Sequence, residues 1–298
     1  MSTLTRQQTW ALIGLTIFWG MNWPMMKLSL QQITPLYFRA ITMTLGALSL
    51  LAYVRWAEGS VWPTRRDWLT LALLMLPNIL AWHTLSIFGV QELASGRAAV
   101  LGFTMPVFTV VLGSLFFGQA ITRRTLVAAT LALASVVLLL WHEASNLSGR
   151  PAGVLWMILA AISWALGTLW MRRANTQASP LRITVWMLLL CCPILWTAAA
   201  ALEPVPALAS FTSVMWASLA WGAWINFGLS QVLWFGLARS LPPSTSTMSI
   251  LAVPVLGTLF ATVVVGEVPV WQDWVALMMV AVAIATVLTP ARTRPAAS

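Results

Sequence analysis

Residues 95–117 read SGRAAVLGFTMPVFTVVLGSLFF, an apolar run that carries a single charged residue, Arg97. A helix needs about 20 mainly apolar residues to cross a bilayer, and this run has that length. Nine more runs of the same kind fill the chain. They lie at 10–30, 35–53, 68–90, 124–141, 152–172, 180–201, 213–237, 244–265 and 271–288. The sequence therefore predicts an all-α integral membrane protein with ten transmembrane helices and short connections.

The composition agrees with a membrane environment. Of 298 residues, 60% are hydrophobic and 8% are charged, whereas a soluble domain has about 25% charged residues. The net charge of +9 does not indicate nucleic-acid binding, because the positive residues are spread between apolar runs and form no patch. The few histidines and cysteines are His83, His142, Cys191 and Cys192, so we expect no metal and no cofactor. The expected partners are membrane lipid and a small-molecule substrate, without nucleic acid, and the expected state is a monomer or weak dimer.

The positive residues also predict the orientation of the helices. When the N-terminus is placed inside, only four of the 16 Lys and Arg residues fall in outside segments. These four are Lys27, Arg39, Arg97 and Arg150. Because positive residues accumulate on the cytoplasmic side of membrane proteins, we expect both termini to be cytoplasmic.

The two halves of the chain resemble one another. A shift of 148 residues matches Asn78 with Asn226, Pro106 with Pro254, and Gly118 with Gly266. A shift of 145 residues matches Trp19 with Trp164 and Pro35 with Pro180. Each copy, 1–148 and 149–298, holds five spans, so the second copy crosses the membrane in the opposite sense. Inverted repeats are common in transporters, and we therefore expect a small-molecule transporter and not an enzyme.

The first span offers one face of candidate substrate-pathway residues. Trp19, Asn22, Trp23 and Lys27 follow helical spacing and combine aromatic rings, an amide and a cation. Lys27 could pair with a substrate carboxylate, or its side chain could extend to the outer interface. An aromatic stripe of this kind is also compatible with simple packing.

The third and eighth spans contribute the repeat mates Asn78 and Asn226. Each amide could bind a zwitterionic substrate or join two helices. Trp82 shares a face with Asn78, whereas His83 is rotated from it by about 140° on an ideal helix. The two faces meet at one cavity only if the helix bends, and Pro77 could cause that bend. The candidate set is completed by Trp164 and Gln231.

The fourth and ninth spans each carry a proline near their centre, Pro106 and Pro254. A proline lacks an N–H and frees the carbonyl four residues earlier, which is that of Gly102 in the fourth span. We expect Pro106, Pro254 and Gly102 to act as hinges or gates. A static kink is the alternative.

The seven acidic residues lie in loops or at the ends of runs. A proton-coupled pump usually needs a carboxylate at mid-membrane, and none is present. Proton coupling would have to use His83 or the substrate itself, so facilitated transport or exchange remains open. An enzyme site would need an acid or a metal beside His83, which the spans do not supply.

Several motifs resemble the EamA-type repeat of the drug/metabolite transporter superfamily. The opening of the first half matches through Trp19-Gly20-x-Asn22, Lys27, Pro35 and Arg39. The closing motif is Pro106-Val107 to Gly118-Gln119 in the first half and Pro254-Val255 to Gly266-Glu267 in the second. The second half departs from the first at Ala165, which replaces Gly20, and at Thr184, which replaces Arg39. Gln119 stands where the family has Glu.

The many tryptophans further resemble the YddG-type amino acid exporter branch. This resemblance implies ten helices around a central Trp-lined cavity in a bacterial inner membrane. It also implies alternating-access export of amino acids, aromatic and other apolar ones among them, and of related small metabolites. A multidrug or organic-cation exporter of the same superfamily is the alternative.

Overall fold

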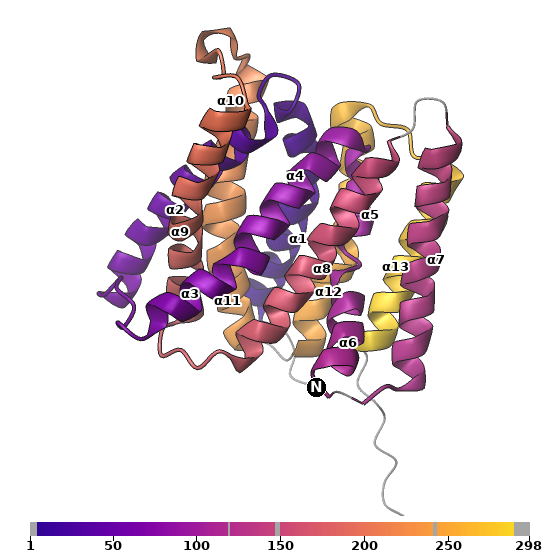
Figure 1. Cartoon of the computed structure of the whole chain (residues 1–298), viewed down its shortest axis with the longest axis horizontal. Helices are drawn as coiled ribbons and strands as arrows, with labels where there is room; N and C mark the ends of the chain where they lie inside the picture. Colours follow the sequence, from indigo (N-terminus) through magenta and orange to yellow (C-terminus); the bar gives the residue numbers. More distant parts are fainter. Residues whose placement is uncertain (1–4, 119, 147–149, 241–242, 289–298) are drawn as a thin grey trace, which may run out of the picture.

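The computed structural model describes residues 5–118, 120–146, 150–240 and 243–288, with the side chains of 238–251 and 287–288 outside the description. Within these ranges every regular element is a helix. The helices run up and down between the two ends of one bundle (Figure 1). The prediction of an all-helical chain is confirmed over the described residues.

Most predicted runs form single helices with bounds close to those expected. These helices are α1 (Arg6–Ser29), α2 (Pro35–Glu58), α7 (Arg123–Ser145), α8 (Pro151–Arg173), α9 (Pro180–Leu202), α12 (Pro243–Val265) and α13 (Trp271–Leu288). Proline starts α2, α8 and α9, where its missing N–H costs no hydrogen bond. Thr5 and Thr122 accept hydrogen bonds that cap α1 and α7.

Three predicted runs are interrupted helices. The run at 68–90 forms α3 (Asp67–Met75), the π-helix η1 (Leu76–Ala81) and α4 (Trp82–Glu92). The run at 213–237 forms α10 (Ser213–Ala220), the π-helix η3 (Trp221–Leu229) and α11 (Ser230–Ser240), after a short 3-10 turn, η2 (Leu208–Ser210). The run at 95–117 forms α5 (Ser95–Gly102) and α6 (Met105–Phe116).

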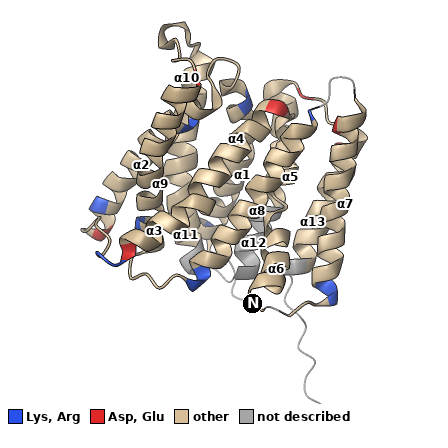
Figure 2. Cartoon of the chain, viewed as in Figure 1, with Lys and Arg blue, Asp and Glu red and all other residues tan. Residues whose placement is uncertain are grey.

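The chain contains helices that can cross a membrane several times. Among the residues that the structure describes, six helical segments are long and apolar enough for this. They are Pro35–Glu58, Asp67–Glu92, Ser95–Phe116, Arg123–Ser145, Pro151–Arg173 and Pro180–Leu202. Charged residues gather near the two ends of the bundle, and the middle is almost free of them (Figure 2). The chain is therefore a multi-pass membrane protein.

At η1 the side chains of the protein satisfy part of the backbone. Around η1, the carbonyl of Pro77 accepts a hydrogen bond from Ser163 of α8 at 3.2 Å, and the carbonyl of Leu74 accepts one from the Asn78 side chain at 2.9 Å. Because lipid offers no hydrogen bonds, irregular backbone at membrane depth must be covered by protein in this way. Pro77 lies in the π-helix η1, and the bend of the helix axis stays a prediction.

One end of the bundle is held together by Lys27. We call the end with connections 30–34, 93–94, 203–212 and 266–270 the latched end. At this end Lys27 donates from Nζ to the carbonyls of Val90, Gln91 and Leu93 at 2.9, 3.0 and 2.7 Å. These carbonyls form the C-terminus of α4, where unpaired acceptors and the helix dipole favour a cation. Lys27 thereby joins α1 to α4.

The halves of the chain also contact each other at the latched end. Glu267, just after α12, accepts hydrogen bonds from the backbone N–H groups of Ser95 and Gly96 at 2.8 and 3.2 Å. These groups start α5, where the positive end of the helix dipole favours a carboxylate. Deeper in the bundle, a Cβ placed on Gly257 of α12 would lie 3.1 Å from Cβ of Ala99 in α5. The two helices are therefore in close contact.

A glutamate at the end of the second helix in each half caps the start of the corresponding helix in the other half. Glu203, at the end of α9, accepts hydrogen bonds from the N–H groups of Leu36 and Tyr37 at 3.0 and 3.1 Å. Glu58, at the end of α2, accepts one from the hydroxyl of Ser179 at 2.7 Å. Glu58 and Glu203 are 145 residues apart, the shift that also matches Pro35 with Pro180. The contacts between α2 and α9 are therefore reciprocal.

In the later part of each half, corresponding helices begin 148 residues apart. Ser95 starts α5 and Pro243 starts α12, and Arg123 starts α7 and Trp271 starts α13. Both pairs are 148 residues apart. Gly118 and Gly266, also 148 apart, have positive φ values of 68° and 77°, a conformation that glycine adopts without strain. The repeated sequence is accompanied by repeated local structure.

We expect Gly46→Ala to destabilise the bundle. A Cβ at Gly46 of α2 would collide with Cβ of Phe227 and lie 2.6 Å from the carbonyl oxygen of Ala223 in η3. Overpacking of this kind costs about 1–3 kcal/mol, so the melting temperature in detergent should fall by several degrees. Gly236→Ala is the matched control, because nothing lies within 4 Å of its added Cβ. Equal melting temperatures for the two variants would contradict the close packing of α2 on η3.

Candidate functional site

Aromatic side chains from the two halves meet beside the π-helices. The ring centroids of Trp82 and Trp164 lie 5.2 Å apart, and those of His83 and Phe227 lie 4.9 Å apart. Trp82 also contacts His83, with centroids 6.5 Å apart. Trp82, His83 and Trp164 are only half-buried. We call these four residues the aromatic set, and it brings together three of the predicted pathway residues.

A further aromatic contact joins α1 to α11. Trp19 and Trp234 lie with their ring centroids 5.5 Å apart, and both are half-buried. This pair, like the aromatic set, combines residues from both halves of the chain. Apolar and aromatic surfaces of this kind line most small-molecule sites.

Buried polar atoms without partners gather at the same two helices. Nδ1 of His83 and Oγ1 of Thr84 lie just after η1, and Nε1 of Trp221 and Oγ of Ser230 lie at the two ends of η3. None of them has a hydrogen-bond partner among the described residues. An unsatisfied buried group costs about 1–3 kcal/mol, which a polar ligand would recover. Gln231, the next residue after Ser230, is half-buried.

The paired asparagines lie inside the two π-helices. Asn78 is buried, and its side chain lies directly against the backbone of Gly167 in α8. Its amide donates to the carbonyl of Leu74 at 2.9 Å. Asn226 is also buried, within η3. The hydrogen bond of Asn78 stays within its own segment, and its contact with Gly167 packs η1 against α8.

The candidate face of α1 is divided among different surroundings. Trp23 is only 4% exposed and packs against Phe103 with ring centroids 6.4 Å apart. Asn22 is half-buried and donates to Sδ of Met26 at 3.7 Å. Lys27 is occupied by the carbonyls at the end of α4. These pairings depend on which helix packs against α1, and helical spacing alone does not reveal them.

The two proline-containing helices differ in structure. The chain breaks between α5 and α6, where the Thr104 hydroxyl donates to the carbonyl of Leu101 at 2.6 Å, and Pro106 is the second residue of α6. A Cβ on Gly102, the last residue of α5, would lie 2.8 Å from the Trp23 ring. Pro254, in contrast, lies inside the continuous α12. The equivalent prolines therefore give a break in one half and an unbroken helix in the other.

Arg39 is a candidate that the sequence analysis did not include. It lies in α2, is 2% exposed, and donates from Nε to the carbonyl of His83 at 3.1 Å. Its Nη2 donates to Sδ of Met26 at 3.0 Å and to Oγ of Ser86 at 3.3 Å. No carboxylate of the described residues forms an ion pair with it. The sequence offered one signal for Arg39, a charged residue within an apolar run. That no carboxylate pairs with it is visible only in the three-dimensional structure.

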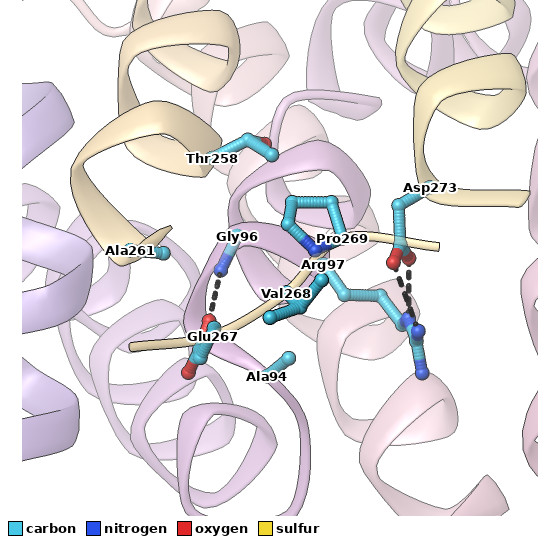
Figure 3. Close-up of a pocket in the computed structure, with 9 residues that line it drawn as sticks. All are labelled: Ala94, Gly96, Arg97, Thr258, Ala261, Glu267, Val268, Pro269 and Asp273. Atoms are coloured by element: carbon cyan, nitrogen blue, oxygen red, sulfur yellow. Dashed lines mark hydrogen bonds and ion pairs between the residues drawn. The ribbon is translucent and has the colours of Figure 1, made fainter. Parts of the chain in front are cut away.

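A small cavity at the latched end has a different character. It measures about 170 Å³ and lies between α5, α12 and α13 (Figure 3). Arg97 points to Asp273, with Nε and Oδ1 2.7 Å apart, and also pairs with Glu143. Glu267 is occupied by the start of α5. The charged groups here pair with each other, so the cavity belongs to the contact between helices.

Known proteins similar to this chain are membrane transporters. The EamA-like transporter family matches residues 8–141 and residues 151–289, one match in each half. The transporter YoaV of Bacillus subtilis (strain 168) is 24% identical over 253 residues, covering 84% of this chain and 85% of the relative. The inner membrane transporter YedA of Escherichia coli (strain K12) is 26% identical over 280 residues, covering 93% and 89%.

A solved structure has the same fold. Its TM-score against this chain is 0.65, with 18% sequence identity, and the likeness covers 93% of this chain and 94% of the other. The family matches together span nearly the whole sequence. The chain belongs to the EamA-like transporter family.

Proposed function

We propose that this transporter exports amino acids, aromatic and other apolar ones among them, from the cytoplasm across a bacterial inner membrane. The observation that carries the proposal is the aromatic set, in which half-buried Trp82, His83 and Trp164 meet buried Phe227, with the unsatisfied Nδ1 of His83 in the set itself. Rings suit an apolar side chain, and free donors and acceptors suit the polar part of an amino acid. Related small metabolites with these two parts belong to the same class.

We also propose ten spans arranged as two inverted five-helix repeats, 1–148 and 149–298, with both termini cytoplasmic. The reciprocal capping by Glu58 and Glu203 supports this arrangement, because it relates α2 and α9 by an approximate two-fold axis. The recurrence of helix starts at a shift of 148 residues supports it as well. Under this proposal the latched end faces the outside.

Alternating access follows from these two proposals. We propose that the contacts of Lys27 and Glu267 hold the latched end closed and that a solute reaches the aromatic set from the cytoplasmic end. Opening toward the outside requires α5 to move away from α12 and α1 from α4. The break between α5 and α6 offers a hinge for that movement, and Pro106, Pro254 and Gly102 retain their proposed roles as hinge or gate residues.

A multidrug or organic-cation exporter is the second candidate, because tryptophan faces also attract cations. The isolated charge of Arg39 opposes it. A buried guanidinium repels a cationic solute, and the aromatic set has no carboxylate beside it to compensate. We therefore favour zwitterionic or anionic solutes.

Purified protein in liposomes should exchange labelled L-phenylalanine with saturation, and unlabelled L-tryptophan should compete. Protein-free liposomes and liposomes with Gly236→Ala protein provide the background and a matched functional control. Absence of saturable flux across a panel of amino acids would overturn the proposed function. Saturable flux of organic cations alone would establish the second candidate instead.

We expect transport by the wild type to continue without a pH gradient, and we expect His83→Ala, which removes a ring of the aromatic set and lowers the rate, to respond to the gradient as the wild type does. The seven acidic residues lie in loops or at helix ends, so the spans lack a carboxylate that could carry a proton. The measurement is phenylalanine flux with and without a protonophore, with His142→Ala as the matched control at a helix end. Strict gradient dependence that His83→Ala abolishes would show instead that His83 couples protons to transport.

A further inference from the structure

We propose that Arg39 is the substrate's carboxylate-binding residue, so that the transported class is defined by a carboxylate on an apolar group, with or without an amino group. This inference rests on the proposed transport through the aromatic set and names the part of the substrate that is recognised there.

The first observation is the isolation of the Arg39 charge. An arginine remains protonated in proteins, and a buried charge is normally paired with an opposite charge. The acceptors around Arg39 are the carbonyl of His83, the sulfur of Met26 and the hydroxyl of Ser86, all of them uncharged. None of these partners balances the charge. An anion is therefore the ligand that this group of donors lacks.

The second observation is that Arg39 and Asn22 both donate to a poor hydrogen-bond acceptor. Both side chains donate to the same atom, Sδ of Met26, at 3.0 and 3.7 Å. A thioether sulfur is a weak acceptor, whereas a carboxylate accepts two parallel hydrogen bonds from a guanidinium. A carboxylate that reaches this point would displace the sulfur and gain donors from α1 and α2 together.

The third observation is the continuity with the aromatic set. The His83 carbonyl contacts Arg39, and the ring of the same residue contacts Phe227. Trp82, the preceding residue, contacts Trp164. A substrate whose carboxylate meets Arg39 would thus have its apolar group beside these rings. The unpaired Nδ1 of His83 and Oγ1 of Thr84 lie in the same turn of α4.

The amino group of an amino acid has no equivalent partner. The acidic residues of the chain lie at helix ends or in loops, and the nearest sequence neighbours of the aromatic set include none. Recognition through Arg39 alone therefore predicts that removing the amino group is tolerated and removing the carboxylate is not. A site that binds both charged groups of the amino acid would tolerate neither removal.

Three matched compounds test the inference in liposomes that carry wild-type protein. L-Phenylalanine has both groups, 3-phenylpropionate lacks the amino group, and phenethylamine lacks the carboxylate. Competition with labelled phenylalanine should give half-inhibition by 3-phenylpropionate within about tenfold of phenylalanine itself, and at least about tenfold weaker inhibition by phenethylamine. Inhibition by phenethylamine as strong as that by 3-phenylpropionate would overturn the inference without any variant.

Variants then assign the effect to Arg39. Arg39→Gln should weaken both carboxylates at least about tenfold and remove their advantage over phenethylamine, and Arg39→Lys should retain part of that advantage. Arg55→Gln is the matched control, because Arg55 lies on the same helix and is exposed. Monodispersity in detergent and the Arg39→Lys result separate a loss of recognition from a loss of folding. An unchanged ratio in a folded Arg39→Gln protein would exclude Arg39 as the carboxylate-binding residue.

The same data separate the two proposals from each other. Saturable flux of labelled 3-phenylpropionate without flux of phenylalanine would remove the amino acid assignment and leave the role of Arg39 in place. Phenylalanine flux with unchanged selectivity in Arg39→Gln would remove the role of Arg39 and leave the assignment in place.

Discussion

The structure depends on one constraint, namely that lipid cannot satisfy a backbone hydrogen bond. A chain in the bilayer is therefore helical wherever lipid touches it, and it departs from the helix only where protein covers the departure. The departures in this chain are η1, η3 and the break between α5 and α6. At η1, Ser163 and Asn78 satisfy the backbone carbonyls, and at the break Trp23 lies against Gly102. These covered segments adjoin the aromatic set, so the irregular backbone and the candidate site occur together.

The same constraint governs the charged residues. Lys27, Glu203 and Glu267 each lie at a helix end and satisfy backbone groups that the helix leaves unpaired. Arg97 is paired with carboxylates. Arg39 has the protection from lipid that these residues have, but not the opposite charge or helix end that would balance it. This difference is the reason why we propose a ligand for Arg39 and not for the other charged residues.

The sequence was sufficient for the regular part of the fold. Apolar length predicted the helical runs, because it acts within one helix, and Pro77 marks the place where the third run departs from the α-helix. The environments of Trp23 and Lys27 could not be predicted from helical spacing, since their partners lie 63 or more residues away along the chain. The same applies to the aromatic set, which takes Trp164 and Phe227 from the second half. Pro106 and Pro254 looked equivalent, but the break next to Pro106 depends on Thr104 and on the packing of Trp23.

If the site between the halves is exposed at each end in turn, α5 must separate from α12 at the latched end during transport. A disulfide across α5 and α12 tests it most directly. In a background with Cys191 and Cys192 replaced by alanine, Ala99→Cys and Gly257→Cys should cross-link on oxidation, because Cβ atoms at these positions lie 3.1 Å apart. Oxidation should abolish phenylalanine flux, and reduction should restore it. Undiminished flux in the fully cross-linked protein would contradict a separation of α5 from α12 during transport.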